Sequence, residues 1–221
     1  YILGSNFISA ATTWNGGTSS NFGTAGNWSN NSPGIAADDG NNNLATINNG
    51  NTVVLSSDYT GTNTYNLAVG GNSTLNASAN FTATGLTVQD TGVVNLTDGA
   101  FTLPKTSASN NGQGSKGTLN IQSGGILNIS GGSHIFNERS TMNGTFRATG
   151  SNASISMNQI GGGNGTFDFV FDAVGVSGVY GNLSFPWLSI GATSVTVDGS
   201  SYTGGVASFT LFDGHGAGNT P

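Results

Sequence analysis

Side chains that could carry acid–base or metal chemistry are few in this chain and widely spaced. In 221 residues there are four Lys or Arg, ten Asp or Glu and two His. The acidic residues are Asp38, Asp39, Asp58, Asp90, Asp98, Glu138, Asp168, Asp172, Asp198 and Asp213. Glycoside hydrolysis needs two carboxyl groups that flank one bond, and lyase chemistry on a β-helix needs a basic residue supported by acidic calcium ligands. No spacing here marks either arrangement, so the sequence disfavours an enzyme.

Asp38 and Asp39 are the best candidates for metal ligands. Three asparagines follow them at positions 41 to 43, and Ca²⁺ prefers carboxylate and amide oxygens. Calcium is therefore the one cofactor that the sequence leaves open, at Asp38 and Asp39. Asp168 and Asp172 alternate with phenylalanines and form a second, poorer calcium candidate on the outward face of a strand.

The three tryptophans are candidate contact residues for a glycan or a second subunit. Trp14 and Trp28 share one N-terminal segment with Phe22, and Trp187 follows Phe185 and a proline in the last third of the chain. A tryptophan ring offers a large apolar face with a polar edge, which suits a sugar ring. The sequence favours a cap for Trp14 and Trp28, which would fold over the first coil of a repeat array, because an open end exposes core and an unpaired edge.

A repeat defines the elements that would position these side chains. Residues 86–103 read LTVQDTGVVNLTDGAFTL and residues 119–136 read LNIQSGGILNISGGSHIF. The matched apolar positions are Leu86/Leu119, Val88/Ile121, Val94/Leu127, Leu96/Ile129 and Leu103/Phe136. Each copy holds three short alternating runs separated by glycine, which predicts three strands and two tight corners. One copy cannot bury its own apolar face but stacked copies can, so the sequence predicts an all-β solenoid.

The bare coil is predicted to hold 19 residues, the step from Leu67 to Leu86. Other copies begin near Ala45 and, after Leu119, near Phe146. The longer steps between copies place polar insertions at one corner, after the third strand, at residues 104–117 and 137–144. Stacked repeats tolerate such insertions as surface loops on one face.

The repeat also decides how several polar residues are interpreted. The counterparts of Asp90 and Asp98 in the second copy are Ser123 and Gly131, which favours turn chemistry over catalysis. His134 takes the place of a phenylalanine, so we expect a half-buried strand residue. With only two histidines and no cysteine, neither a Ser-His-Asp arrangement nor a histidine- or cysteine-based metal site can be assembled.

Composition excludes several classes of protein. Glycine accounts for 37 residues and charged residues for only 6%, and the chain holds one Glu, so no long amphipathic helix is expected. A net charge of −6 with four basic residues argues against nucleic acid as a partner, and we expect no membrane insertion. Much Asn, Gly, Ser and Thr, with little Lys and no cysteine, favours an exported chain at the cell surface or outside the cell. The start at Tyr1 without Met favours a processed or excised segment, with the signal sequence already removed.

Three regions are predicted along the chain. Residues 1–43 form an N-terminal strand and cap segment, and residues 44–164 form the solenoid coils. Residues 165–221 lose the 19-residue spacing and carry longer, more aromatic strands, with alternating runs such as FDFVF at Phe167–Phe171 and VTV at Val195–Val197, which favours a C-terminal β cap or a small sandwich. An apolar strand in this region could also stay unpaired until it docks on a neighbouring subunit.

The first two thirds of the chain resemble a known family. Trp14-x-Gly16-Gly17, then Asn27-Trp28, Pro33 and Asp38-Asp39, precede the coil pattern Ala45-x-Ile47-x-x-Gly50-x-x-Val53-x-Leu55. This order, with GTLNIQSGGILNISGG at residues 117–132, is similar to autotransporter-passenger-like repeat proteins, including those that carry a C-terminal sorting tail. The resemblance covers roughly residues 12–157. It implies a right-handed β-solenoid at the bacterial cell surface, used for adhesion, matrix building or display.

These patterns together predict a structural or adhesive protein at the cell surface. We expect partners to be copies of the same chain, assembled into a fibre or matrix by edge-to-edge or head-to-tail β contacts, and also cell-surface glycans. A polysaccharide-binding or polysaccharide-cleaving β-helix is the alternative. Ice binding is a third function, but the columns of threonine that it needs are interrupted by Asn, Gln and Ser.

Overall fold

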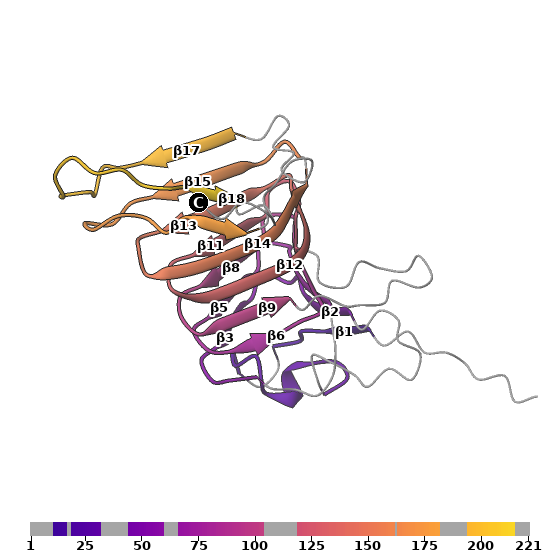
Figure 1. The fold of residues 1–221 in the computed structure, drawn as a ribbon. Coiled ribbons are helices and arrows are strands. Elements are labelled where there is room, and N and C mark those ends of the chain that lie inside the picture. The colour runs from indigo at the N-terminus through magenta and orange to yellow at the C-terminus, as the bar shows by residue number, and fades with distance from the viewer. Residues whose placement is uncertain are drawn as a thin grey trace, which may run out of the picture.

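The protein folds as a β-solenoid, seen in a computed structural model that describes residues 11–16, 19–31, 44–59, 66–103, 119–161, 163–181 and 194–214. Every pairing between the described strands is parallel, and successive coils of the chain contribute strands to three faces that stack along one axis (Figure 1). Among the described residues the only helical element is the 3-10 turn η1 (Ala25–Asn27). The predicted all-β solenoid is confirmed.

The strands divide among the three faces as follows. Face one contains β1 (Ala11–Thr13), β2 (Leu44–Ile47), β4 (Asn66–Val69), β7 (Gly85–Val88) and β10 (Leu119–Ile121). Face two contains β3 (Thr52–Leu55), β5 (Thr74–Ala77), β8 (Val93–Leu96), β11 (Ile126–Ile129), β13 (Thr145–Thr149), β15 (Thr166–Val170) and β17 (Ser194–Asp198). Face three contains β6 (Phe81–Thr82), β9 (Ala100–Leu103), β16 (Val179–Gly181) and β18 (Phe212–Gly214). Two longer strands, β12 (Gly132–Met142) and β14 (Ala153–Gly161), run from face three around the corner onto face one.

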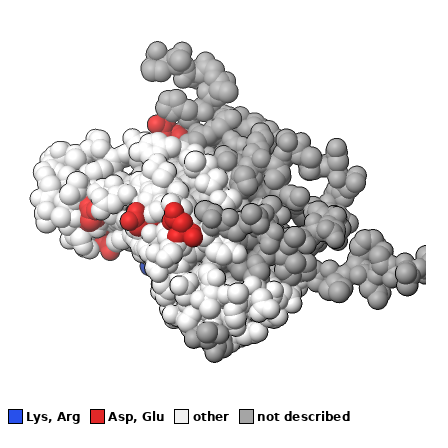
Figure 2. Space-filling model, turned by 90° about the horizontal axis from the view of Figure 1, so that it is seen from below, with Lys and Arg blue, Asp and Glu red and all other residues white. Residues whose placement is uncertain are grey.

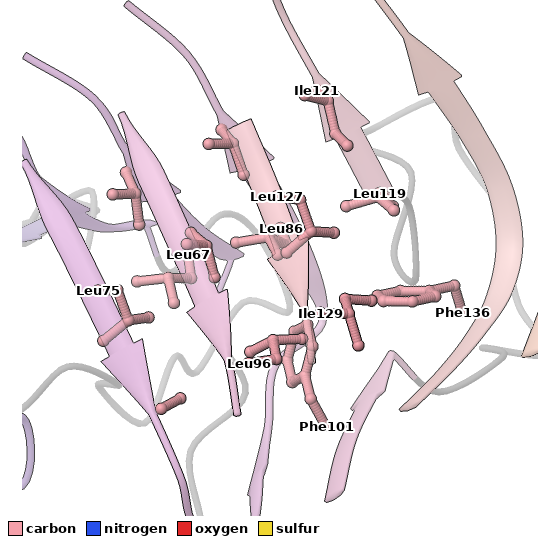
Figure 3. Packing of buried hydrophobic residues seen from close by; sticks show 14 of the residues in the cluster. Leu67, Leu75, Leu86, Leu96, Phe101, Leu119, Ile121, Leu127, Ile129 and Phe136 are labelled. Atoms are coloured by element: carbon pink, nitrogen blue, oxygen red, sulfur yellow. The ribbon is translucent and has the colours of Figure 1, made fainter. Parts of the chain in front are cut away.

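The core is a set of apolar columns that run up the inside of the solenoid. In the matched repeats, Leu86 pairs with Leu119, Val94 with Leu127 and Leu103 with Phe136, and all six are buried. Figure 3 shows four of them, Leu86, Leu119, Leu127 and Phe136, pointing into the space between the faces. Alternate residues of each strand therefore supply the core, which is the period-2 pattern from which the solenoid was predicted.

Glycine permits the tight corners between faces. Gly71 has a φ of +56°, and a Cβ built on it would lie 2.2 Å from the carbonyl oxygen of Asn48 in the coil below. Gly132 has a φ of +83°, and a Cβ there would lie 2.2 Å from the carbonyl oxygen of Gly99. Both positions combine a left-handed backbone with close approach of the next coil, so a larger residue would be strained and would clash.

One predicted insertion is wrong, and the error comes from register. Phe146 was aligned with Leu119 on face one, but it pairs with Leu127 on face two, at a step of 19 residues. Residues 137–142 are therefore not a corner insertion: they belong to β12, which carries on from face three to face one. The register of β12 against β14 shifts between Phe136 and Arg139, and this shift lies where β12 turns the corner. The other predicted insertion, residues 104–117, lies outside the described residues.

In its described residues, the C-terminal third continues the stacked strands of the solenoid. β15 and β17 extend face two in parallel register, and β16 and β18 extend face three. The rings of Phe167 and Phe169 each contact the ring of Phe212 in a T-shaped arrangement, at centroid distances of 5.2 and 5.4 Å. The spacing of 19 residues is lost because the last coils are longer, while the stacking of strands persists.

Candidate functional site

The outward side of face two carries a ladder of amide and hydroxyl groups. Asn95 donates from Nδ2 to Oδ1 of Asn76 at 2.7 Å, and Asn128 donates to Oδ1 of Asn95 at 3.4 Å. Thr149 then donates its hydroxyl to Oδ1 of Asn128 at 3.0 Å. The register of face two stacks the three asparagines in successive coils, and Thr149 lies two residues beyond Arg147, the partner of Asn128, so these hydrogen-bonding groups satisfy one another. This ladder is a structural element with no free acid or base.

The same column ends in the single ion pair found among the described residues. Arg147 donates from Nε to Oδ2 of Asp168 at 2.7 Å, and Thr196 donates its hydroxyl to Oδ1 of the same carboxylate at 2.6 Å. Both carboxylate oxygens of Asp168 are therefore hydrogen-bonded to this column. An ion pair with an Arg side chain that is 41% exposed contributes little to stability, and it leaves Asp168 poorly suited to bind calcium.

Asp172 is held at a corner by backbone groups. Its carboxylate accepts hydrogen bonds from the backbone N–H groups of Ser151, Val174 and Gly175, at 2.8 to 2.9 Å, and from the Ser151 hydroxyl. The bonds from Gly175, Ser151 and Val174 favour the charged form and lower the pKa of Asp172 to about 2. Asp58 is similar, because the backbone N–H and the side-chain amide of Asn80 lower its pKa. These acids organise turns.

Metal ligands do not converge in the described part of the chain. No group of three His, Asp or Glu side chains that could hold an ion occurs there. Asp38 and Asp39, the predicted calcium ligands, lie outside the described residues and stay a prediction. Figure 2 shows the acidic side chains of one face as separate patches on a largely uncharged surface.

His134 is a core residue. It stacks on Phe101 as predicted, but its side chain is fully buried and not half-buried. Its Nε2 lies 2.6 Å from the carbonyl oxygen of Gly131, and its Nδ1 accepts the backbone N–H of Phe101 at 3.3 Å. This pattern requires the neutral ring with its proton on Nε2. Desolvation lowers the pKa of His134, and the Gly131 bond opposes that shift without reversing it.

A shallow polar hollow lies at the corner between faces one and two. It is lined by Asn120, Gln122, Ser123, Thr141, Asn143 and Asn164. These residues come from three successive coils, and the backbone N–H of Asn164 donates to Oδ1 of Asn143 at 3.2 Å. The lining offers neutral hydrogen-bonding groups and neither a charge nor an aromatic ring. It suits a neutral hydroxylated ligand and provides no acid–base pair.

The two described tryptophans form the centre of the N-terminal end. Trp14 is 1% exposed and Trp28 is 2% exposed, and their rings contact edge to face at a centroid distance of 5.2 Å. Phe22 packs on Trp28 at 5.3 Å, and the indole N–H of Trp28 donates to the carbonyl oxygen of Phe22 at 2.8 Å. In this arrangement neither indole presents a face to a sugar ring. Trp187 lies outside the described residues.

The segment of residues 19–31 also covers the backbone edges of the first strands. Ser20 and Phe22 exchange hydrogen bonds with Val54 on the outer edge of β3, at 2.7 and 2.8 Å. Asn27 and Ser29 bond in the same way to the outer edge of the chain at Thr13 and Asn15. The N-terminal end is therefore closed in two ways, by buried aromatic rings over the core and by backbone groups along the edges.

The C-terminal end of face two is open. β17 is the last strand of that face, and no described strand lies on its outer side (Figure 1). Val195 and Val197 continue the inward columns above Phe167 and Phe169, yet they are 43% and 55% exposed, whereas the two phenylalanines below them are fully buried. An apolar column that ends in exposed valines on an unpaired edge is a surface suited to another strand.

Sequence reasoning identified the strand Val195–Val197 but not its position at the open end. The apolar alternation SVTVD marks a strand, while the exposure of its valines depends on what stacks above it, which no local pattern encodes.

Comparison with known proteins adds no assignment: no family model, no curated protein and no solved structure matches the chain. No helix in the described ranges has the length and apolarity to cross a membrane.

Proposed function

We propose that this chain is a structural and adhesive surface protein that assembles through β-edge contacts. The observation that carries the proposal is the exposed last rung of face two, where Val195 and Val197 line an edge strand with no described strand on its outer side. Long exposed edges of this kind template the addition of another strand, and monomeric proteins normally protect them with charge, proline or a cover. In β17 the single charged residue is Asp198, at the strand's end.

The polar side chains support a structural role over a catalytic one. Asp168 is paired with Arg147, and Asp58 and Asp172 accept turn hydrogen bonds, so these carboxylates are already engaged in the fold. In the described ranges, the side chains that repeat from coil to coil form the apolar core and the hydrogen-bonded ladder of face two. Location at the cell surface rests on the composition and on the family resemblance given above.

The covered N-terminal end affects which assembly we propose. Head-to-tail stacking would need the segment of residues 19–31 to leave the edges of β1 and β3, together with its buried tryptophans. Edge-to-edge contact through β17 needs no such rearrangement. We therefore place the first contact of any fibre or matrix at the C-terminal end, and growth beyond that contact requires a second surface.

Sedimentation velocity and electron microscopy of the purified full chain test this proposal. The expected result is association that increases with protein concentration, with rods joined end to end. The matched comparison is a Val195→Lys chain, which places a charge on the exposed last rung and leaves the buried rungs below it unchanged, and should stay monomeric. A wild-type chain that remains a single short rod at every concentration would contradict the assembly proposal.

Glycan binding is the second candidate function, favoured by the neutral hollow at the corner between faces one and two. Its amides and hydroxyls suit hydroxyl groups of a polysaccharide, and without an acid pair there we propose binding and not cleavage. Calorimetric titration with soluble surface polysaccharides tests it, with Gln122→Ala and Asn143→Ala as paired variants. Equal affinity in wild type and in both variants would place glycan binding elsewhere or remove it.

A further inference from the structure

We infer that the partner of β17 is β17 of a second copy, paired antiparallel about a two-fold axis at Thr196. This inference rests on the proposed assembly and names its contact. Self-pairing is favoured because the other end of the solenoid offers no free edge on β1 or β3, where residues 20–29 supply the hydrogen bonds. On face two, a second copy therefore presents one open edge strand, and that strand is its own β17.

The hydrogen bonds that β17 makes inward define which groups point outward. Ser194 donates its backbone N–H to the carbonyl oxygen of Gly165 at 3.0 Å, and Asp198 accepts from Phe171 at 2.9 Å. In a parallel ladder, alternate residues of a strand bond to the same neighbour. Ser194, Thr196 and Asp198 thus bond to β15, whereas the N–H and C=O groups of Val195 and Val197 point to the outer edge.

One antiparallel register uses all of these outward groups. With Thr196 opposite Thr196 of the second copy, Val195 lies opposite Val197 of that copy, and Val197 opposite its Val195. Both are then hydrogen-bonded pairs, which supplies four backbone hydrogen bonds from two residues of each chain. Shifting the register by one residue or more leaves at least one outward-pointing valine of each chain without its partner valine.

The side chains match in the same register. The inward valines of both copies meet on the core side and extend the apolar columns of each solenoid over the other, which covers Val195 and Val197 where each chain alone leaves them exposed. On the outward side Ser194 lies opposite Asp198 of the second copy, a hydroxyl donor opposite a carboxylate acceptor. No like charges are placed opposite each other, since Thr196 meets itself.

Single-cysteine variants test this register, because the chain has no cysteine of its own. Thr196 is the residue that would face itself, in a non-hydrogen-bonded pair with Cα atoms about 4.5 Å apart, within disulfide reach. Thr196→Cys should therefore form a covalent dimer under mild oxidation on a non-reducing gel. The matched control is the exposed Ser200→Cys, four residues further on; strand spacing would separate two such positions by about 27 Å.

The outcomes separate the inference from the proposal on which it rests. A dimer from Thr196→Cys but not from Ser200→Cys supports the two-fold contact. If wild type assembles in sedimentation but Thr196→Cys forms no crosslink, this contact is overturned and the structural role stands. Equal crosslinking of Thr196→Cys and Ser200→Cys would have the same meaning. A wild-type chain that is monomeric throughout would overturn both. Val206→Lys, a charge on an exposed loop residue, is the surface-charge control for Val195→Lys, and it should associate like wild type.

Discussion

The two ends of this solenoid differ in how their core and their outermost strands are covered. At the N-terminal end, Trp14, Phe22 and Trp28 are buried over the first coil, and backbone groups of the same segment bond to the outermost strands. At the C-terminal end the last rung of face two leaves Val195 and Val197 exposed on an edge that no other described strand pairs. A stack of identical coils has no intrinsic end, so each end needs its own cover. The difference shows which end is built to stay closed.

Removing the aromatic cap should give the largest loss of stability. Trp28→Ala removes a fully buried ring and its bond to the Phe22 carbonyl, so we expect a decrease of about 3–5 kcal/mol in the free energy of unfolding. Trp28→Phe keeps an aromatic ring and loses the N–H, and should cost less. Chemical denaturation followed by tryptophan fluorescence measures both. If Trp28→Ala were as stable as wild type, the cap would contribute no stability.

The same variant should also change assembly. Weakening the cap frees the outer edges of β1 and β3, and a chain open at both ends can stack head to tail into a fibre. Electron microscopy should therefore show longer filaments for Trp28→Ala than for wild type, with Val197→Ala as the matched change at the open end. A Trp28→Ala chain that folds and still forms no longer species would show that the cap does not limit growth.

A ring at the C-terminal end should matter less than one at the N-terminal end. Phe212 is only partly buried, and it contacts Phe167 and Phe169 edge to face. We expect Phe212→Ala to lower the free energy of unfolding by ~1–2 kcal/mol, less than full burial of a phenylalanine would contribute. Phe212→Leu is the matched control that keeps apolar contact. A loss equal to that of Trp28→Ala would contradict the contrast between the ends.

The sequence predicted the coils better than it predicted their ends. All five matched apolar pairs lie side by side, because the alternation of buried residues and the glycine corners are local features that the chain encodes. Phe146 was assigned to the wrong face, since the strands of all three faces share the same period-2 pattern and the same glycine spacing. The misaligned register then required extra residues after the third strand, and these were predicted as a corner loop at residues 137–144, where the structure has the continuous strand β12 up to Met142.

The candidate contact surface was less predictable, for a different reason. The valines of SVTVD match the buried alternation of strands inside the stack, and only their place as the last rung makes them exposed. For the tryptophans the sequence could not decide between a buried cap and an exposed platform for sugar rings, because both use the same aromatic side chains. Burial decides between them, and burial depends on how the segment of residues 19–31 folds back over the first coil.

Acid should destabilise the middle of the stack before it affects the C-terminal corner. The pKa of buried His134 lies below its ordinary value of 6.5, because burial disfavours the charged ring. The unfolded chain then binds a proton that the folded chain does not, so the free energy of unfolding falls as the pH drops below 6.5 towards the lowered pKa. Thermal unfolding between pH 7 and pH 5 should show this slope in wild type and not in His134→Gln, which removes the titrating ring. An equal slope in both chains would assign the acid sensitivity to other groups.

The smallest effect is expected at Asp172, and it belongs to the open end. Its pKa is lowered to about 2 by backbone N–H groups of Gly175, Ser151 and Val174, so its charged form stabilises the fold fully above its ordinary value of 3.8. That contribution is lost as the pH falls from 3.8 through about 2, where the carboxylate takes up a proton and its turn bonds weaken. Amide hydrogen exchange should therefore show residues 172–175 opening in this range while residues 19–31 stay protected. Asp172→Asn should open the same corner at neutral pH, and Asp198→Asn, a change at the end of β17, is the matched control. If the N-terminal cap lost protection together with the Asp172 corner, the two ends would unfold as one unit, and the contrast in how they are closed would carry no energetic consequence.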